Sequence, residues 1–275
     1  MPQKTAHYRT LFISDLHLGT RGCQHELIID FLKHNDADTI FLVGDIIDGW
    51  KLKSGWYWPQ GHNDVVQKLL RKVRKGARMV YVPGNHDEFA REYVGMTFGG
   101  VEVMRTAIHT TADGRRFLVT HGDDFDIVVR NVRWLAYRGD WAYTTAMAAN
   151  TVFNIVRRRL GFPYWSFSAW AKLKVKNAVN FIGDFEEVVS QDAVKHAVDG
   201  VICGHIHHAT MRDINGVTYV NTGDFVESCS FVAEHHDGRL EVMRWLTLGG
   251  AATAATEPEP EAGLALGEEA AKVAA

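Results

Sequence analysis

The sequence predicts an α/β fold in which two mixed β-sheets pack on each other. Short apolar, β-branched runs alternate with amphipathic segments in the first part of the chain, a pattern typical of parallel βαβ units. Several of these runs end in glycine beside aspartate, asparagine or histidine, and open α/β sheets bind ligands at this end of their strands. The strand pattern returns near the end of the chain, which indicates the second sheet.

The first part of the chain reads as alternating strands and helices. Strands are expected over residues 8–14, 39–43 and 79–82, and helices over residues 25–34 and 64–75. Asp64 favours the beginning of the second helix, and the basic residues at positions 71–75 favour its end. The aromatic stretch over residues 50–59 is expected to be a loop.

Shorter strands and an insertion are expected in the rest of the chain. Strands are expected over residues 101–104, 107–111, 117–120, 201–203, 209–213, 217–220, 230–234 and 240–245. Residues 126–185 show no strand pattern, so we expect a helical cap insertion there. The predicted domain spans residues 1–250, and the tail over 251–275, rich in alanine and glutamate, is expected to be disordered.

The bulk composition restricts the partners and the compartment. The chain is 46% hydrophobic and 23% charged, with a net charge of -3, so no nucleic-acid partner is expected. Its three cysteines have no close paired spacing, which favours a reducing compartment. We find no apolar leader and no run near the roughly 20 residues of a membrane span. The expected location is cytoplasmic, with peripheral binding to the cytoplasmic face of the inner membrane as an option.

Metal-type ligands end five of the predicted strands. They are three carboxylates or amides and four imidazoles: Asp15, Asp45, Asn85, His17, His121, His205 and His207. Seven donors exceed what one ion takes from a protein, so the set implies two divalent ions that share a bridging ligand. Asp45 is best placed to bridge. Nitrogen and oxygen ligands without thiolate suit Mn, with Fe or Zn as alternatives. A pair of such metal ions catalyses the hydrolysis of phosphate esters or anhydrides.

Five ordered motifs are similar to those of the calcineurin-like metallophosphoesterases over residues 8–245. They are Asp15-x-His17, Gly44-Asp45-x-x-Asp48, Gly84-Asn85-His86-Asp87, His121 and Gly204-His205-x-His207. The resemblance implies a four-layer sandwich, with two mixed β-sheets flanked by helices and a helical insertion. It also implies an enzyme that hydrolyses phosphate ester or diphosphate bonds with two bound metal ions.

The resemblance also implies a role for each matched residue. One metal would be held by Asp15, His17, Asp45 and His207, and the other by Asp45, Asn85, His121 and His205. His86 would be a catalytic residue facing the substrate phosphate, with Asp48 as its acid partner, and Asn85 would also contact the substrate. A carboxylate beside an imidazole favours its charged form, which stabilises developing charge or protonates a leaving oxygen.

Within the family, the sequence most resembles the members that hydrolyse UDP-2,3-diacylglucosamine in lipid A synthesis, which implies a lipid-linked phosphorylated substrate. The predicted insertion is rich in basic and aromatic side chains, which suit such a substrate or an anionic membrane. We expect substrate contacts from Arg157, Trp165, Lys172 and Lys176. The run Arg157-Arg158-Arg159 is the part expected at the membrane surface.

Two other functions remain open at this point. One is a soluble phosphodiesterase or phosphatase acting on nucleotides or other small phosphoesters. It is favoured because His86 stands where the diacylglucosamine enzymes carry arginine, and Val128 and Val129 stand where they carry an acidic pair. The other is a non-catalytic scaffold of the same fold. Such relatives usually lose metal ligands, whereas this sequence retains all seven.

Overall fold

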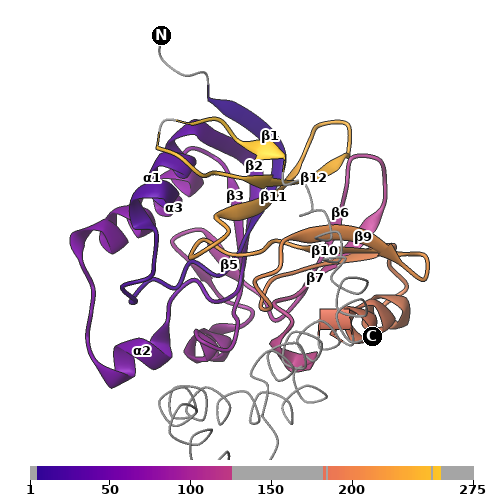
Figure 1. Ribbon diagram of the computed structural model, residues 1–275, viewed down its shortest axis with the longest axis horizontal. Helices are drawn as coiled ribbons and strands as arrows, with labels where there is room; N and C mark the ends of the chain where they lie inside the picture. Colours follow the sequence, from indigo (N-terminus) through magenta and orange to yellow (C-terminus); the bar gives the residue numbers. More distant parts are fainter. Residues whose placement is uncertain (1–4, 126–181, 184, 249, 255–275) are drawn as a thin grey trace, which may run out of the picture.

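The computed structural model describes residues 5–125, 182–183, 185–248 and 250–254. Two mixed β-sheets lie face to face at its centre (Figure 1). Helices α1 (His25–His34) and α3 (Gln60–Arg74) cover the outer side of one sheet. A helical segment over residues 185–195 covers the outer side of the other sheet. This helix–sheet–sheet–helix arrangement confirms the predicted α/β sandwich.

The first sheet has eight strands in the order β13-β12-β11-β1-β2-β3-β5-β4. They are β1 (Ala6–Ile13), β2 (Asn35–Val43), β3 (Arg78–Val82), β4 (Thr97–Phe98), β5 (Val101–Val103), β11 (Ser230–Glu234), β12 (Leu240–Arg244) and β13 (Thr253–Ala254). Strands β1, β2, β3 and β5 run parallel, and the remaining pairs are antiparallel. The parallel strands therefore end at one common edge.

The second sheet has five strands in the order β6-β7-β8-β10-β9. They are β6 (Ala107–Thr110), β7 (Arg116–Val119), β8 (Gly200–Cys203), β9 (Thr210–Ile214) and β10 (Val217–Asn221). Three short helices connect strands near the ends of the sheets: α2 (Gly49–Ser54), η1 (Glu88–Tyr93) and η2 (Asp123–Phe125). Strands β7, β8 and β10 run parallel, so they also present their carboxyl ends together.

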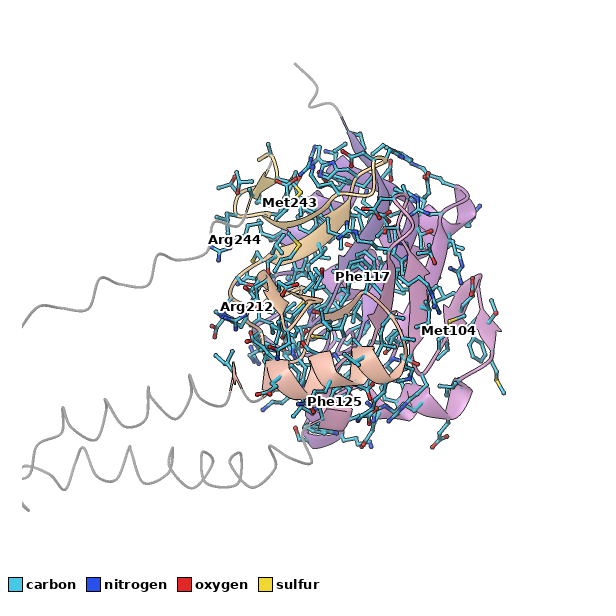
Figure 2. The ribbon with its side chains drawn as sticks, turned by 90° about the vertical axis from the view of Figure 1, so that its right-hand side faces the viewer. Met104, Phe117, Phe125, Arg212, Met243 and Arg244 are labelled. Carbon is cyan, nitrogen blue, oxygen red and sulfur yellow. The ribbon has the colours of Figure 1, made fainter. Side chains whose placement is uncertain are left out.

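Alternating side chains of the central strands build the core layers. On β1, Leu11 and Ile13 face the layer under α1, where they join Phe31. Phe12, between them, faces the layer between the two sheets, because successive side chains of a strand point to opposite faces. Phe117 lies in this inner layer, near the middle of the side view (Figure 2). The third layer joins the second sheet to the helix over residues 185–195, in which Phe185 is fully buried.

Helix α1 has the predicted bounds, but two predictions around α2 and α3 were wrong. Helix α3 begins at Gln60, not at Asp64, because Pro59 leads into the helix in an extended conformation. The carboxylate of Asp64 accepts a hydrogen bond from the side-chain amide of Gln60 (2.9 Å), and Asp64 lies one turn after the beginning of α3. Part of the expected aromatic loop is helix α2. Its first turn is capped by Asp48, which accepts a hydrogen bond from the backbone N–H of Lys51 (2.8 Å).

The predicted tail and insertion lie largely outside the described residues. Strand β13 belongs to the stretch expected to be disordered, yet it pairs with Met243 and Arg244 of β12 (Figure 2). The prediction was therefore wrong for these residues, and residues 255–275 lie outside the described part. Residues 126–181 of the expected cap insertion also lie outside it, so the bounds of the insertion remain a prediction.

A buried carboxylate joins the two sheets. Glu234 of β11 accepts hydrogen bonds from the hydroxyl of Thr10 on β1 (2.6 Å) and from Nε2 of His109 on β6 (2.7 Å). The N–H of Ala112 donates to it (2.8 Å), and Arg9 pairs with it. Burial alone would raise the pKa of Glu234, but these hydrogen bonds outweigh it and lower the pKa to about 2.

We expect Glu234→Gln to destabilise the protein at neutral pH and to flatten its loss of stability in acid. The folded pKa of about 2 lies below the ordinary 4.5, so the stabilisation is present above pH 4.5 and is lost as the pH falls toward about 2. This lowering of the Glu234 pKa corresponds to a contribution of about 3 kcal/mol to the free energy of unfolding at neutral pH. Urea unfolding from pH 7 downward measures this contribution, with Glu92→Gln, a change at an exposed glutamate, as the control. An unchanged acid slope in Glu234→Gln would contradict the assignment.

Candidate metal centre

All seven predicted metal ligands follow strands that end at one rim of the sandwich. Asp15 and His17 follow β1, Asp45 follows β2, and Asn85 follows β3 in the loop that also carries His86. In the second sheet, His121 follows β7, whereas His205 and His207 follow β8. Because these strands are parallel neighbours within their sheets, the residues converge although they are far apart in sequence.

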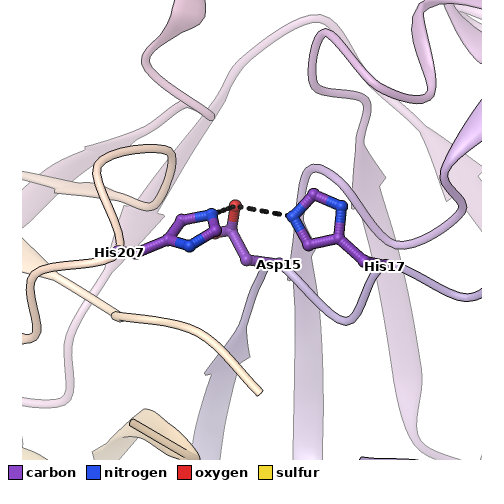
Figure 3. A group of neighbouring side chains, drawn as sticks. All are labelled: Asp15, His17 and His207. Carbon is purple, nitrogen blue, oxygen red and sulfur yellow. Dashed lines mark ion pairs between the residues drawn. The ribbon is translucent and has the colours of Figure 1, made fainter. Parts of the chain in front are cut away.

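The side chains gather into groups with the spacing of metal ligands. One group contains Asp15, His17 and His207, and another contains Asp45, His121 and His205; within each, the candidate ligand atoms lie within 4.8 Å of one another. Asp15 Oδ1 is 3.0 Å from His207 Nε2 and 3.8 Å from His17 Nε2 (Figure 3). A third group joins His17 and Asp45 to His86. Asp45 therefore lies between the two predicted metal positions.

Five of the predicted ligands have left-handed backbone conformations. Asp15, His17, Asp45, His205 and His207 have φ between +48° and +74°. Residues other than glycine rarely adopt this region, and each such residue costs about 1 to 3 kcal/mol. Strain of this kind persists where the chain must direct a side chain into a site. The conformations therefore support a functional role for this rim.

Two glycines leave the space that the buried ligands occupy. A Cβ at Gly44, whose φ is +80°, would lie 2.2 Å from His121 Nδ1. A Cβ at Gly84 would lie 2.4 Å from Asp45 Oδ1 and 2.6 Å from His121 Nε2. Both glycines belong to the sequence motifs, and their role is to let backbone and ligand approach closely.

Hydrogen bonds to one ring nitrogen orient two of the histidines. Nδ1 of His121 lies 2.9 Å from the carbonyl of Val43, so it donates a proton there and leaves Nε2 facing Asp45 Oδ2 at 3.4 Å. Nδ1 of His17 lies 3.3 Å from Asp48 Oδ2, which leaves its Nε2 facing Asp15. Metal-binding histidines are typically held in this way by a carbonyl or carboxylate behind the ring.

The donor set fits divalent cations. Four buried atoms of the predicted ligands have no hydrogen-bond partner among the described residues: Asp15 Oδ1, His17 Nε2, Asn85 Oδ1 and His121 Nε2. An unsatisfied buried polar atom costs about 1 to 3 kcal/mol, and two bound cations, one at each predicted position, would satisfy all four. The ligands supply nitrogen and oxygen without thiolate, which matches transition metals of intermediate hardness.

Charges within the rim stabilise one another. Burial would lower the pKa of His121, but the Asp45 carboxylate outweighs it and raises the pKa to about 10. Burial would raise the pKa of Asp45, yet His121, and then His86 and His17, hold it below its ordinary value. The pKa of Asp15 is lowered in the same way by His207. The rim therefore retains ionised carboxylates, the form that binds cations.

The predicted catalytic pair lies beside the metal ligands. Nδ1 of His86 is 3.0 Å from Asp48 Oδ2, and the His86 side chain is 22% exposed. Asp48 also contacts His17, and the hydrogen bonds from His17 and His86 lower its pKa against the effect of burial. The ring of Trp50 lies 4.3 Å from that of His86. Trp50 therefore lines the site.

Two supporting contacts connect the loops that carry the ligands. The buried carboxylate of Asp87 accepts hydrogen bonds from the N–H groups of Gly84 (2.5 Å) and Ile46 (2.8 Å) and from the Tyr81 hydroxyl. It thus ties the loop after β3 to the loop after β2. Arg91 of η1 donates to Asp123 beside the His121 loop (2.6 Å). Sequence reasoning singled out neither Tyr81 nor Arg91, since no motif marks them.

Some predicted residues lie outside the described part of the chain. These are the substrate contacts Arg157, Trp165, Lys172 and Lys176, and the positions Val128 and Val129. The basic run expected at a membrane lies there too. A bilayer-spanning helix needs a length and an apolar character that no helix in the described ranges has.

The fold and this rim define a metal-dependent phosphoesterase, a hydrolase that acts on phosphate esters. The sequence pattern of the calcineurin-like phosphoesterases matches residues 8–209. The chain therefore belongs to the calcineurin-like phosphoesterase family, whose members use divalent metal ions.

The relatives of this chain include proteins named for different functions. A UDP-2,3-diacylglucosamine hydrolase of Xanthomonas campestris pv. campestris is 26% identical over 247 residues, covering 83% of this chain and 96% of its own. The DNA polymerase II small subunit of Methanothermobacter thermautotrophicus is 23% identical over 261 residues and covers 83% of this chain, which spans about half (50%) of that relative. The solved structure of Yfce, a phosphoesterase from E. coli, has a TM-score of 0.41 at 14% identity over 90% of this chain and 99% of its own.

We expect Asp45→Asn to lose both metal ions, because Asp45 is the predicted shared ligand and an amide is a weaker, neutral ligand. Elemental analysis of the purified variant measures the metal content, and circular dichroism checks that it folds. Asp38→Asn, a change at an exposed aspartate, is the matched control and should keep the wild-type metal content. Full metal content in Asp45→Asn would show that this residue is not the bridge.

Proposed function

We propose that this phosphoesterase uses two metal ions to hydrolyse the diphosphate of UDP-2,3-diacylglucosamine or a related lipid-linked phosphate. The observation that carries the chemistry is the pair of ligand groups on either side of Asp45 at one rim. The observation that favours this substrate is the set of relatives named UDP-2,3-diacylglucosamine hydrolase, two of which match 83% and 84% of this chain over 96% and 93% of their own length.

The proposed ligand assignment follows the two groups. Asp15, His17 and His207 would hold one ion, and Asn85, His121 and His205 the other, with Asp45 shared between them. Manganese is the proposed metal, with iron or zinc as alternatives. Two such ions, when bound, polarise phosphate oxygens and lower the pKa of water.

His86 is the proposed catalytic residue of the protein itself. Its ring is partly exposed at the rim, and its Nδ1 lies 3.0 Å from Asp48 Oδ2. This leaves Nε2, which is 4.0 Å from Asp45 Oδ2, as the atom next to the ligand groups. As an imidazolium, His86 would stabilise charge on a phosphate oxygen or protonate the leaving oxygen.

The lipid part of the substrate would be bound by the helical insertion. We propose that residues 126–185 form a cap within a domain spanning residues 1–250, with Arg157, Trp165, Lys172 and Lys176 in contact with the substrate. Basic and aromatic side chains suit a ligand with anionic and apolar parts. A lipid-linked substrate would also place the enzyme on the cytoplasmic face of the inner membrane.

A soluble phosphodiesterase or phosphatase for nucleotides is the second candidate. It is favoured by His86, where the diacylglucosamine enzymes of the family carry arginine. Both candidates use the same metal chemistry and differ in the substrate. The complete ligand set disfavours the non-catalytic scaffold.

We expect His86→Gln to keep its metal content and to lose about 100-fold or more in kcat on substrates with poor leaving groups. The loss should be smaller with a good leaving group such as nitrophenolate, which needs little protonation. Steady-state kinetics on both substrate types measures this, with the exposed His196→Gln as control. If His86→Gln hydrolyses substrates with poor leaving groups at the wild-type rate, the proposed catalytic role of His86 is wrong.

The substrate is tested by turnover of UDP-2,3-diacylglucosamine by the manganese-loaded protein, in parallel with nucleotides and aryl phosphodiesters. We expect release of UMP and the lipid monophosphate at a rate far above the rest of the panel. Turnover of small phosphoesters without turnover of the lipid would overturn the lipid proposal and select the second candidate.

A further inference from the structure

The segment that follows the Gly84–Asp87 loop exposes an unusual number of large apolar side chains. Phe89, Tyr93, Val94, Met96 and Phe98 are each between 40% and 52% exposed. We call residues 88–100, which comprise η1 and β4, the apolar finger. All of its residues from 92 to 100 are exposed. Contiguous exposed apolar surface on a folded domain usually marks an interaction site.

The apolar finger is an ordered projection. The N–H of Gly95 donates to the carbonyl of Val103 (2.9 Å), and the N–H of Val103 donates to the carbonyl of Met96 (2.9 Å). The rings of Tyr93 and Phe98 meet edge to face at 5.4 Å. These contacts hold the apolar side chains in place while leaving them open to solvent.

The tip of the finger lies against α3, which extends the apolar surface. A Cβ at Gly99 would lie 3.5 Å from the side chain of Leu70, which is itself exposed, and one at Gly100 would meet Val73. The next residues of this helix are basic. Arg71, Arg74 and Lys75 are exposed, and none pairs with a carboxylate among the described residues.

A surface that combines exposed apolar and cationic side chains suits the surface of an anionic lipid bilayer. Exposed aromatic and aliphatic side chains beside unpaired basic residues bind the boundary between lipid headgroups and acyl chains, and the cations favour anionic lipids. Glu88 and Glu92 are the exposed acids of the finger, and Glu88 accepts a hydrogen bond from Trp50. The three unpaired cations of α3 therefore outnumber them in a chain whose net charge is -3.

The finger is also joined directly to the catalytic rim. It begins one residue after Asp87, and the ring of Phe89 lies 3.0 Å from the position of a Cβ on Gly49. The next residue, Trp50, packs on His86. A surface that contacts the finger would therefore lie close to the open side of the rim.

We propose that the apolar finger and the basic end of α3 form a docking surface for an anionic phospholipid bilayer. Docking would hold the rim beside the membrane, and this benefit rests on the proposed lipid-linked substrate. A second copy of the chain fits the surface poorly, because a two-fold contact would bring the same cations together. Strand β4, with two residues, is also too short to pair with the edge of another sheet.

The test is flotation of the full-length protein with vesicles of phosphatidylcholine alone or mixed with phosphatidylglycerol. We expect binding to the anionic vesicles that weakens with salt. Met96→Ser/Phe98→Ser and Arg71→Glu/Arg74→Glu should each weaken it about tenfold or more. The matched control Ile108→Ser/Val194→Ser changes exposed apolar side chains elsewhere and should bind as the wild type does. All variants should keep wild-type rates on a soluble aryl phosphodiester.

The outcomes separate this proposal from the proposed function. Wild-type protein that does not bind anionic vesicles, or finger variants that bind unchanged, would overturn the docking surface even if the lipid substrate is hydrolysed. A finger variant that changes only the oligomeric mass would overturn it in favour of a second copy. Finger-dependent vesicle binding would support it, including where the lipid substrate is not hydrolysed and only the proposed function fails.

Discussion

The placement of the Asp45 carboxylate is the constraint on which the rest of the site depends. Its oxygens face different elements: Oδ1 accepts a hydrogen bond from the backbone N–H of His86 (2.8 Å), and Oδ2 lies 3.4 Å from His121 Nε2. A buried carboxylate without such partners would be very unfavourable. The two sheets must therefore bring the ends of β2, β3 and β7 together before this group can be buried.

Support for the site comes from acids that are not themselves predicted ligands. Asp48 contacts His17 and His86 and also caps α2. Asp87 joins the loops after β2 and β3. Each of these carboxylates serves more than one backbone segment, so a change at either would move several groups together. Such supporting contacts hold a catalytic geometry more rigidly than the ligands alone.

Sequence patterns predicted the parts of the fold that are local and repetitive. The spacing of Ile28, Phe31 and Leu32 placed α1, and the apolar runs placed the central strands. The motifs at the strand ends identified the residues that converge at the rim. The pairing of β13 with β12 was missed because strand pairing depends on distant partners. The contacts of Tyr81 and Arg91 were missed because they arise only after the loops have come together.

At the rim, the left-handed backbone conformations of the predicted ligands reduce the stability of the folded chain while they direct side chains into the site. A glycine at position 17 or 207 would adopt φ near +50° without steric cost. It would also remove an imidazole from the cluster. Relief of the backbone strain would favour the folded chain, while the predicted metal site would lose a ligand. The strain at these positions is therefore a cost that the fold alone does not require and that the predicted ligand geometry does.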